Sequence, residues 1–265
     1  MSQLFNRYCE VRLGNRVITA PPFSIEFDQT FKSGTIGSTI LKLYNPSFDT
    51  IKAAESTKSG KTWVHPEVTI DAGYDDDYGT CVLGYAVSHS VKQQGPDKIL
   101  EVKITDATNN WSNAIIGKTY QNMKASAIVD NVLVELGINS KNLEYGTDLT
   151  YNKITVKSFK YFLKRMAKDT DSTFSFKNGI LEIKPKTQSR EIEIYLLSNA
   201  SGLLDAPEKT LRGLKIKTLF FYNILPMDVV RVVSNEYDGF FKIFRGTKKF
   251  SSFGNATCNF EVIEI

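Results

Sequence analysis

The sequence predicts an α+β protein that is mainly β, with two β-barrel domains and a small α/β domain inserted between them. One observation is the stretch 158–185, where apolar residues at helical spacing are followed by two alternating segments around an Asn-Gly pair. The others are the stretches on either side, which carry many alternating strand patterns and almost no helical ones. We therefore expect a first barrel at 1–106, an α/β insert of helices and a hairpin at 107–188, and a second barrel at 189–265.

The first predicted barrel contains short strands and one small helix. A Gly-Asn pair at 14–15 separates the first two strands, as expected for a tight hairpin. Ser47 is placed to cap a helix from about Phe48 to Glu55, with Phe48, Ile51 and Ala54 facing inward. The expected strands cover 9–13, 16–19, 24–31, 39–44, 68–74, 80–91 and 99–105.

The insert begins with a helix over 124–136, which Gly137 ends at the usual position. A loop then passes through Asn142 and Tyr151. The second helix has one apolar face, and two strands flank the Asn178-Gly179 turn, which wants positive φ values. The residues of that face are Phe159, Phe162, Leu163 and Met166, and the two strands cover 173–177 and 180–183.

Strand patterns return in the last third of the chain. Gly, Asn and Asp residues punctuate them at the positions expected of turns. The expected strands cover 191–197, 213–220, 228–233, 239–246 and 257–263.

Composition narrows the class of protein. The net charge of +4 is weak for a dedicated nucleic-acid binder and is not gathered into a basic block. Three widely spaced cysteines, Cys9, Cys81 and Cys258, favour folding in a reducing compartment. No apolar run approaches the ~18 residues of a membrane span, and charged residues interrupt the start where a signal peptide would need an apolar core. We expect synthesis in the cytoplasm.

Two loops resemble ligand-binding motifs. Residues 56–62 (STKSGKT) end like a phosphate-binding loop, but Glu55 stands where that motif needs its first glycine, and the predicted order is helix, loop, strand. We interpret this stretch as a solvated connector. Asp75, Asp76 and Asp77 offer oxygen ligands for Ca²⁺ without the alternate spacing of a calcium loop, so we interpret them as a charged hairpin tip.

No set of residues carries a recognisable catalytic or metal-binding pattern. His65, His89 and Cys81 lack zinc-ligand spacing, and no nucleophile signature is present. Trp63 and Trp111 could line a carbohydrate platform, although buried aromatic residues are the commoner case. We therefore expect no catalytic residue, no metal and no cofactor.

Three ordered stretches form a more specific pattern. The first contains a helix ending in Leu-Gly at 136–137, then reads F-x-x-x-L-K-x-x-A-x-D-T-x-S through the second helix and N-G-x-L-x-I-x-P through the hairpin. The second is Ser-Gly-Leu-Leu-Asp-Ala-Pro at 201–207, followed by a strand and Asn-Ile-Leu-Pro-Met-Asp at 223–228. The third is Leu-Tyr-Asn-Pro-Ser at 43–47. The first pattern is filled by Phe159, Leu163, Lys164, Ala167, Asp169, Thr170, Ser172, Asn178, Gly179, Leu181, Ile183 and Pro185.

This combination, which covers about two-thirds of the chain, resembles the baseplate or tail hub proteins of tailed bacteriophages and related contractile injection systems. The VgrG-type spike proteins of type VI secretion share that hub architecture. Met227 departs from the pattern, because the family has glycine at that position.

The resemblance implies a structural protein of the virion tail, at the baseplate or tail tip, and not an enzyme. Three copies would form a homotrimeric ring in which six barrels have near-sixfold symmetry. That ring would act as a symmetry adaptor between a sixfold tail tube, or adjoining tail and baseplate proteins, and a threefold central spike or fibre protein. Its lumen would pass DNA or a tape-measure protein without specific binding.

A closed ring requires extensive heterologous contacts, on the order of 2,000 Å² each. We expect them around the second barrel, although each candidate could equally fill a core. The candidates are Leu203, Leu204, Phe220, Phe221 and Leu225. Two alternatives stay open: a tail-associated glycan or cell-wall hydrolase, which needs close carboxylates or a metal in a cleft, and a carbohydrate-binding β module, which needs an exposed Trp63 or Trp111.

Overall fold

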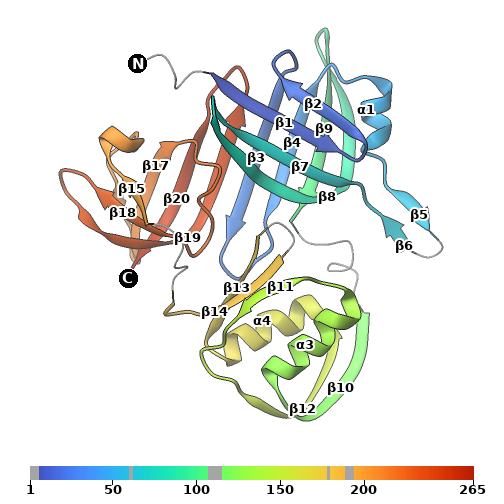
Figure 1. Cartoon of the computed structure of the whole chain (residues 1–265), viewed down its shortest axis with the longest axis vertical. Coiled ribbons are helices and arrows are strands. Elements are labelled where there is room, and N and C mark those ends of the chain that lie inside the picture. Colours follow the sequence, from blue (N-terminus) through green and yellow to red (C-terminus); the bar gives the residue numbers. More distant parts are fainter. Residues whose placement is uncertain (1–5, 60–61, 107–114, 178–179, 189–193) are drawn as a thin grey trace.

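The computed structural model describes residues 6–59, 62–106, 115–177, 180–188 and 194–265, and it is mainly β with few helices (Figure 1). The mainly-β α+β class predicted from the sequence is confirmed. Two β-rich regions lie side by side, and the smaller α/β insert lies against them at one end.

The first β region follows the predicted order closely. Its elements are β1 (Arg7–Leu13), β2 (Arg16–Ala20), β3 (Ile25–Lys32), β4 (Ser38–Tyr44), α1 (Phe48–Ala53), β5 (Thr57–Ser59), β6 (Thr62–Val64), β7 (Glu67–Tyr74), β8 (Asp77–Gln94) and β9 (Asp97–Thr105). Alternation explains these strands: along β3 the side chains of Ile25, Phe27 and Phe31 are buried, and those between them face outward. Gly14, with φ of +56°, closes the β1–β2 hairpin.

One expectation in this region is wrong, and one stretch is more ordered than expected. The stretch at 56–62, interpreted as a solvated connector, contributes the exposed strand β5 and the first residue of β6 to a short hairpin. Ser47 caps α1 as predicted, accepting a hydrogen bond from the Thr50 amide at 3.2 Å, but Phe48 is 77% exposed. The helix is only six residues long, so one narrow face, ending at the buried Ala54, meets the core.

The insert contains two helices and two small sheets. Its elements are β10 (Ile115–Lys124), α3 (Ala125–Leu136), β11 (Ser140–Leu143), β12 (Thr150–Ser158), α4 (Phe159–Asp169), β13 (Ser172–Lys177) and β14 (Ile180–Pro185). Gly137, with φ of +61°, ends α3 as predicted, and the predicted apolar face of α4 is buried. The Asn178-Gly179 turn lies outside the described residues.

The loop expected through Asn142 and Tyr151 is wrong, because this segment forms β11 and β12. Along β12, Tyr151, Ile154 and Val156 are buried, and the strand pairs antiparallel with β10. No turn signal marks this pairing, since α3 and β11 separate the two strands in the chain.

The second β region contains β15 (Ile194–Leu197), the 3-10 turn η2 (Asn199–Ser201), β16 (Glu208–Lys209), β17 (Gly213–Leu219), β18 (Val229–Val233), β19 (Asp238–Ser251) and β20 (Thr257–Glu264). Each predicted strand is present, although residues 191–193 of the first one lie outside the described residues. β19 extends past Gly246, where the expected strand stopped, as far as Ser251.

The two β regions share one sheet and do not form two closed barrels. Thirteen of the described strands join in the order β16-β17-β20-β19-β3-β4-β9-β8-β7-β1-β2, with β18 pairing with β19 and β15 with β18. The expectation of separate barrels is wrong, because β19, with fourteen residues, is long enough to pair with strands of both regions. It pairs with β18 near its start and with β3 from Arg245 to Ser251.

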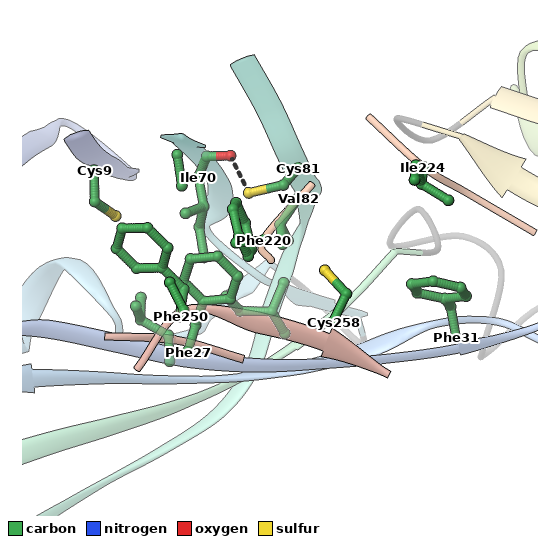
Figure 2. Packing of buried hydrophobic residues seen from close by; sticks show 14 of the residues in the cluster. Cys9, Phe27, Phe31, Ile70, Cys81, Val82, Phe220, Ile224, Phe250 and Cys258 are labelled. Carbon is green, nitrogen blue, oxygen red and sulfur yellow. Dashed lines mark hydrogen bonds between the residues drawn. The ribbon is translucent and has the colours of Figure 1, made fainter. Parts of the chain in front are cut away.

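One hydrophobic core fills both β regions. It includes buried residues from Cys9 in β1 to Val262 in β20. Figure 2 shows Phe27, Phe250 and Phe220 packed together: the rings of Phe27 and Phe250 stack with centroids 5.4 Å apart, and Phe220 meets Phe250 edge-on at 5.1 Å. Since these rings come from β3, β19 and the segment after β17, the core joins sequence-distant elements.

A second core fills the insert, where α3 and α4 pack with the apolar sides of its strands. The turn after β3 connects the insert to the β regions: the Gly34 amide donates to the Phe174 carbonyl at 2.8 Å, and the hydroxyls of Ser33 and Thr173 lie 2.7 Å apart. No described helix is long and apolar enough to cross a membrane. The two domain boundaries, after residues 106 and 188, stay a prediction.

Candidate interaction surface

The loops that resemble ligand-binding motifs occupy ordinary surface positions. Asp75 and Asp76 form the turn between β7 and β8, so the aspartate run is a hairpin tip, as predicted. Part of the phosphate-loop-like stretch lies in β5, and Gly60 and Lys61 are outside the described residues.

The histidines and cysteines do not form a metal site in the described part of the chain, where no three His, Cys, Asp or Glu side chains gather suitably. His65 Nδ1 lies 2.7 Å from the Ser56 hydroxyl. Cys81 is buried and its thiol donates to the Ile70 carbonyl at 3.2 Å (Figure 2), and burial raises the pKa of this thiol to about 12. His89 is half-buried on β8.

The two tryptophans differ in what can be said of them. Trp63 is 52% exposed on the small β5–β6 hairpin, whereas Trp111 lies outside the described residues.

The predicted interface residues Leu203 and Leu204 face opposite ways. A capping box between Ser198 and Ser201 begins the turn η2, and Gly202, with φ of +104°, ends it. The chain then runs beside β17, where Leu204 donates its amide to the Lys217 carbonyl at 2.9 Å. Leu203 is 4% exposed and belongs to the core, while Leu204 is 44% exposed.

The remaining three candidates line the core side. Phe220 is buried against Phe27 and Phe250. Phe221 and Leu225 are half-buried. The five residues are therefore close in the fold but are not gathered on one exposed surface, and Leu204 is the member whose side chain is free to meet a neighbour. Their role at an interface stays a prediction.

An exposed apolar face lies at the end of the sheet, and none of its residues was among the interface residues predicted from the sequence. Ile194 and Leu196 of β15 are 61% and 51% exposed, and Phe240 of β19 is 48% exposed. The strand register aligns Leu196 with Arg231, and Arg231 with Phe240, so these side chains form one row. We call Ile194, Leu196 and Phe240 the β15 face. The sequence of this strand, Ile-Tyr-Leu-Leu, is apolar throughout, so it carries no signal of which side chains are exposed.

A buried lysine lies inside the shared core. Lys248 of β19 is fully buried, its ammonium donates to the Tyr222 carbonyl at 2.6 Å, and it lies 5.6 Å from the centre of the Phe31 ring. Burial lowers the pKa of this ammonium. Burial also raises the pKa of the Asp106 carboxyl to about 7, against the opposing effect of Lys248.

No family model and no curated protein sequence matches this chain. Solved structures do match it. The 43 kDa tail protein of prophage MuSo2 from Shewanella oneidensis has a TM-score of 0.69 at 12% identity, covering 98% of both chains. A type VI secretion component from E. coli, described as structurally similar to the T4 bacteriophage tail proteins gp27 and gp5, has a TM-score of 0.72 at 11% identity, over 97% of this chain and 76% of that one.

A chain of the Francisella PdpA–VgrG complex also matches, with a TM-score of 0.62 at 7% identity; the match covers all of the present chain and 53% of that one. At such low identity the likeness concerns the fold. It spans both β regions and the insert together. The chain therefore has the same fold as this phage tail protein, the type VI secretion component and the chain of the PdpA–VgrG complex.

Proposed function

We propose that this protein is a structural hub of a phage tail or phage-derived injection particle, without catalytic activity. Three copies form a ring that adapts the sixfold tail tube, or the tail and baseplate proteins next to it, to a threefold spike or fibre. The proposed location is the baseplate or tail tip. The observation that carries the proposal is the match over nearly the whole chain to tail proteins and to a type VI secretion component.

The internal architecture supports an adaptor. Two β regions that share one sheet and one core give each protomer two β units at a fixed relative position. Three such protomers present six β units around an axis, which is how threefold assembly can match a sixfold neighbour.

A ring also needs two different surfaces on each protomer that are complementary to each other. Leu204 and the β15 face are apolar and exposed in the monomer. Among the described residues β15 pairs only with β18, so its other edge is open to a neighbouring chain. These features suit heterologous contacts between copies.

The mass of the purified protein in solution tests the proposal, together with negative-stain images. We expect particles of three times the monomer mass and ring-shaped projections, alone or after addition of the neighbouring tail protein. A protein that stays monomeric under both conditions would overturn the ring.

Carbohydrate binding is a second candidate, because Trp63 is exposed. Quenching of tryptophan fluorescence by cell-wall oligosaccharides, lost in Trp63→Ala, would support it. Fluorescence that does not respond to any of these sugars would exclude this role for Trp63.

A further inference from the structure

A cleft separates the insert from the second β region. Its volume is about 450 Å³, and α4 and β13 contribute one wall while β19 contributes another. Two contacts fix its width: the Gly34 amide donates to the Phe174 carbonyl, and the Lys242 ammonium donates to the Lys186 carbonyl at 2.6 Å. The two walls therefore belong to parts of the chain that are tied together.

The cleft is strongly basic. Five cationic residues line it, and no Asp or Glu is among its described lining residues: Lys164, Lys168, Lys186, Arg212 and Lys242. The whole chain has a net charge of only +4, so this is a local concentration of positive charge. We call this site the basic cleft.

Few of these charges are neutralised within the described structure. Lys186 forms an ion pair with Asp171 at 2.7 Å. Lys164, Lys168 and Arg212 take part in no ion pair among the described residues. Lys242 is 8% exposed and donates to backbone carbonyls, which are neutral acceptors and so do not cancel its positive charge.

Repulsion between lysines destabilises α4, the helix that forms one wall of the cleft. Lys160, Lys164 and Lys168 follow each other at intervals of four residues on α4, and Lys160 and Lys164 line a small pocket beside the cleft. Like charges at this spacing destabilise a helix by a few tenths of a kcal/mol per pair. On an open surface such lysines would need no ligand, but here the row stands at the rim of a concave site.

The chemistry of the cleft selects the kind of anion. Apolar side chains of Ala167, Phe244 and Ile263 line the cleft together with the cations. The hydroxyls of Ser33 and Thr173 pair with each other, and Lys242 is turned to carbonyls. A phosphate site needs several donors that converge on one point. Cations that are spaced apart and accompanied by apolar groups instead match an acidic peptide, whose carboxylates are spaced along the chain with an apolar side chain between them.

We propose that the basic cleft receives a short acidic peptide segment with an apolar side chain, supplied by another protein of the tail assembly. This rests on the proposed function for the identity of the partner, but the site lies within one chain and can be tested without the ring.

The test uses the full chain and a fluorescein-labelled hexapeptide of alternating glutamate and leucine, read by fluorescence anisotropy. We expect it to bind at least tenfold more tightly than the matching glutamine–leucine peptide, and more weakly as salt is raised. Lys164→Glu combined with Lys168→Glu should weaken binding at least tenfold, because both side chains are exposed at the rim.

Lys153→Glu combined with Lys157→Glu is the matched control. These exposed lysines of β12 belong to the same insert, give the same change of charge and do not line the cleft. Binding within twofold of the original protein is expected, with all variants showing the same melting temperature.

Equal binding of the two peptides, or a Lys164/Lys168 variant that binds like the control, would overturn the site. Displacement of the peptide by inorganic phosphate or oligothymidylate as effectively as by unlabelled peptide would overturn the assignment of the ligand. The mass of each sample, measured in parallel, separates these results from failure of the ring.

Discussion

The rings of Phe27 and Phe250 stack with an interplanar angle of 10°, and this contact joins the first β region to the second. Phe27 belongs to β3 and Phe250 to β19, and the two residues are also register partners in the sheet. Backbone pairing and side-chain packing therefore coincide at the junction of the two regions.

Phe250→Ala should destabilise both β regions together. The side chain is 2% exposed and contacts Phe27 and Phe220, so its removal leaves a cavity costing about 3–5 kcal/mol. Unfolding in denaturant, followed by tryptophan fluorescence and by hydrogen exchange in β7 and β17, should show one shared shift. If β17 opens early and β7 keeps its original protection, the two regions do not share one core.

At Met227, the glycine variant should be more stable than the alanine variant, which is the reverse of the usual order. Its φ is +74°, and its side chain is 1% exposed. Alanine and glycine both remove the buried side chain, but glycine adopts this backbone conformation without strain. Met227→Gly should therefore be more stable than Met227→Ala by about 1 kcal/mol.

The control is Met166, which is buried on α4. In a helix glycine is less favourable than alanine by about 1 kcal/mol, so Met166→Gly should be the less stable of that pair. Thermal unfolding of the four variants checks both orders. The same order at the two positions would contradict the role assigned to the backbone at Met227.

Asp106 should make stability depend on pH. Its Oδ1 is buried without a hydrogen-bond partner among the described residues, and burial raises the pKa of the carboxyl from 3.8 to about 7. Between these values the folded state binds more protons than the unfolded state, so stability falls as pH rises from about 4 to about 7. One proton sets the limit of this slope, about 1.4 kcal/mol per pH unit.

Asp106→Asn should remove that part of the slope, as measured by urea denaturation at pH 4, 5, 6 and 7. Asp76→Asn, at the exposed β7–β8 turn, is the control and should keep the original slope. An Asp106→Asn profile parallel to that of the control would show that Asp106 does not hold a proton in the folded protein.

Leu204 should matter for assembly and little for folding. It is 44% exposed, so Leu204→Asp is expected to reduce the fraction of three-chain particles at least tenfold while the melting temperature changes by less than about 2 °C. Val134→Asp, 83% exposed on α3, is the matched control and should assemble normally. Sedimentation or mass photometry distinguishes the outcomes; rings that persist in Leu204→Asp would remove this residue from the interface.

Local patterns in the sequence were sufficient for most elements. The three- and four-residue spacing of Phe159, Phe162 and Met166 specified the face of α4, and the residues around the Asp75 turn specified β7 and β8. These features depend on neighbours within a few positions, which is the range over which helical and strand periodicity acts.

Long-range pairing could not be predicted in the same way. The contact of β19 with β3 joins residues more than 200 positions apart, and neither strand carries a mark of its partner. The interface residues show a related limit: Leu203 and Leu204 are both apolar leucines, and only their placement beside β17 decides which one is buried. The basic cleft was also missed, since its cations come from α4, β19, the turn after β14 and the turn before β17.

The length of β19 has a mechanical consequence. Seven registered pairs, from Arg245 to Ser251, hold it to β3, while its first residues pair with β18 in the second β region. A pull or twist applied at β15 and β18 travels along this strand and loads those hydrogen bonds in shear, where they must yield together. Each protomer should thus respond to force as one rigid body and not as two domains joined by a flexible hinge.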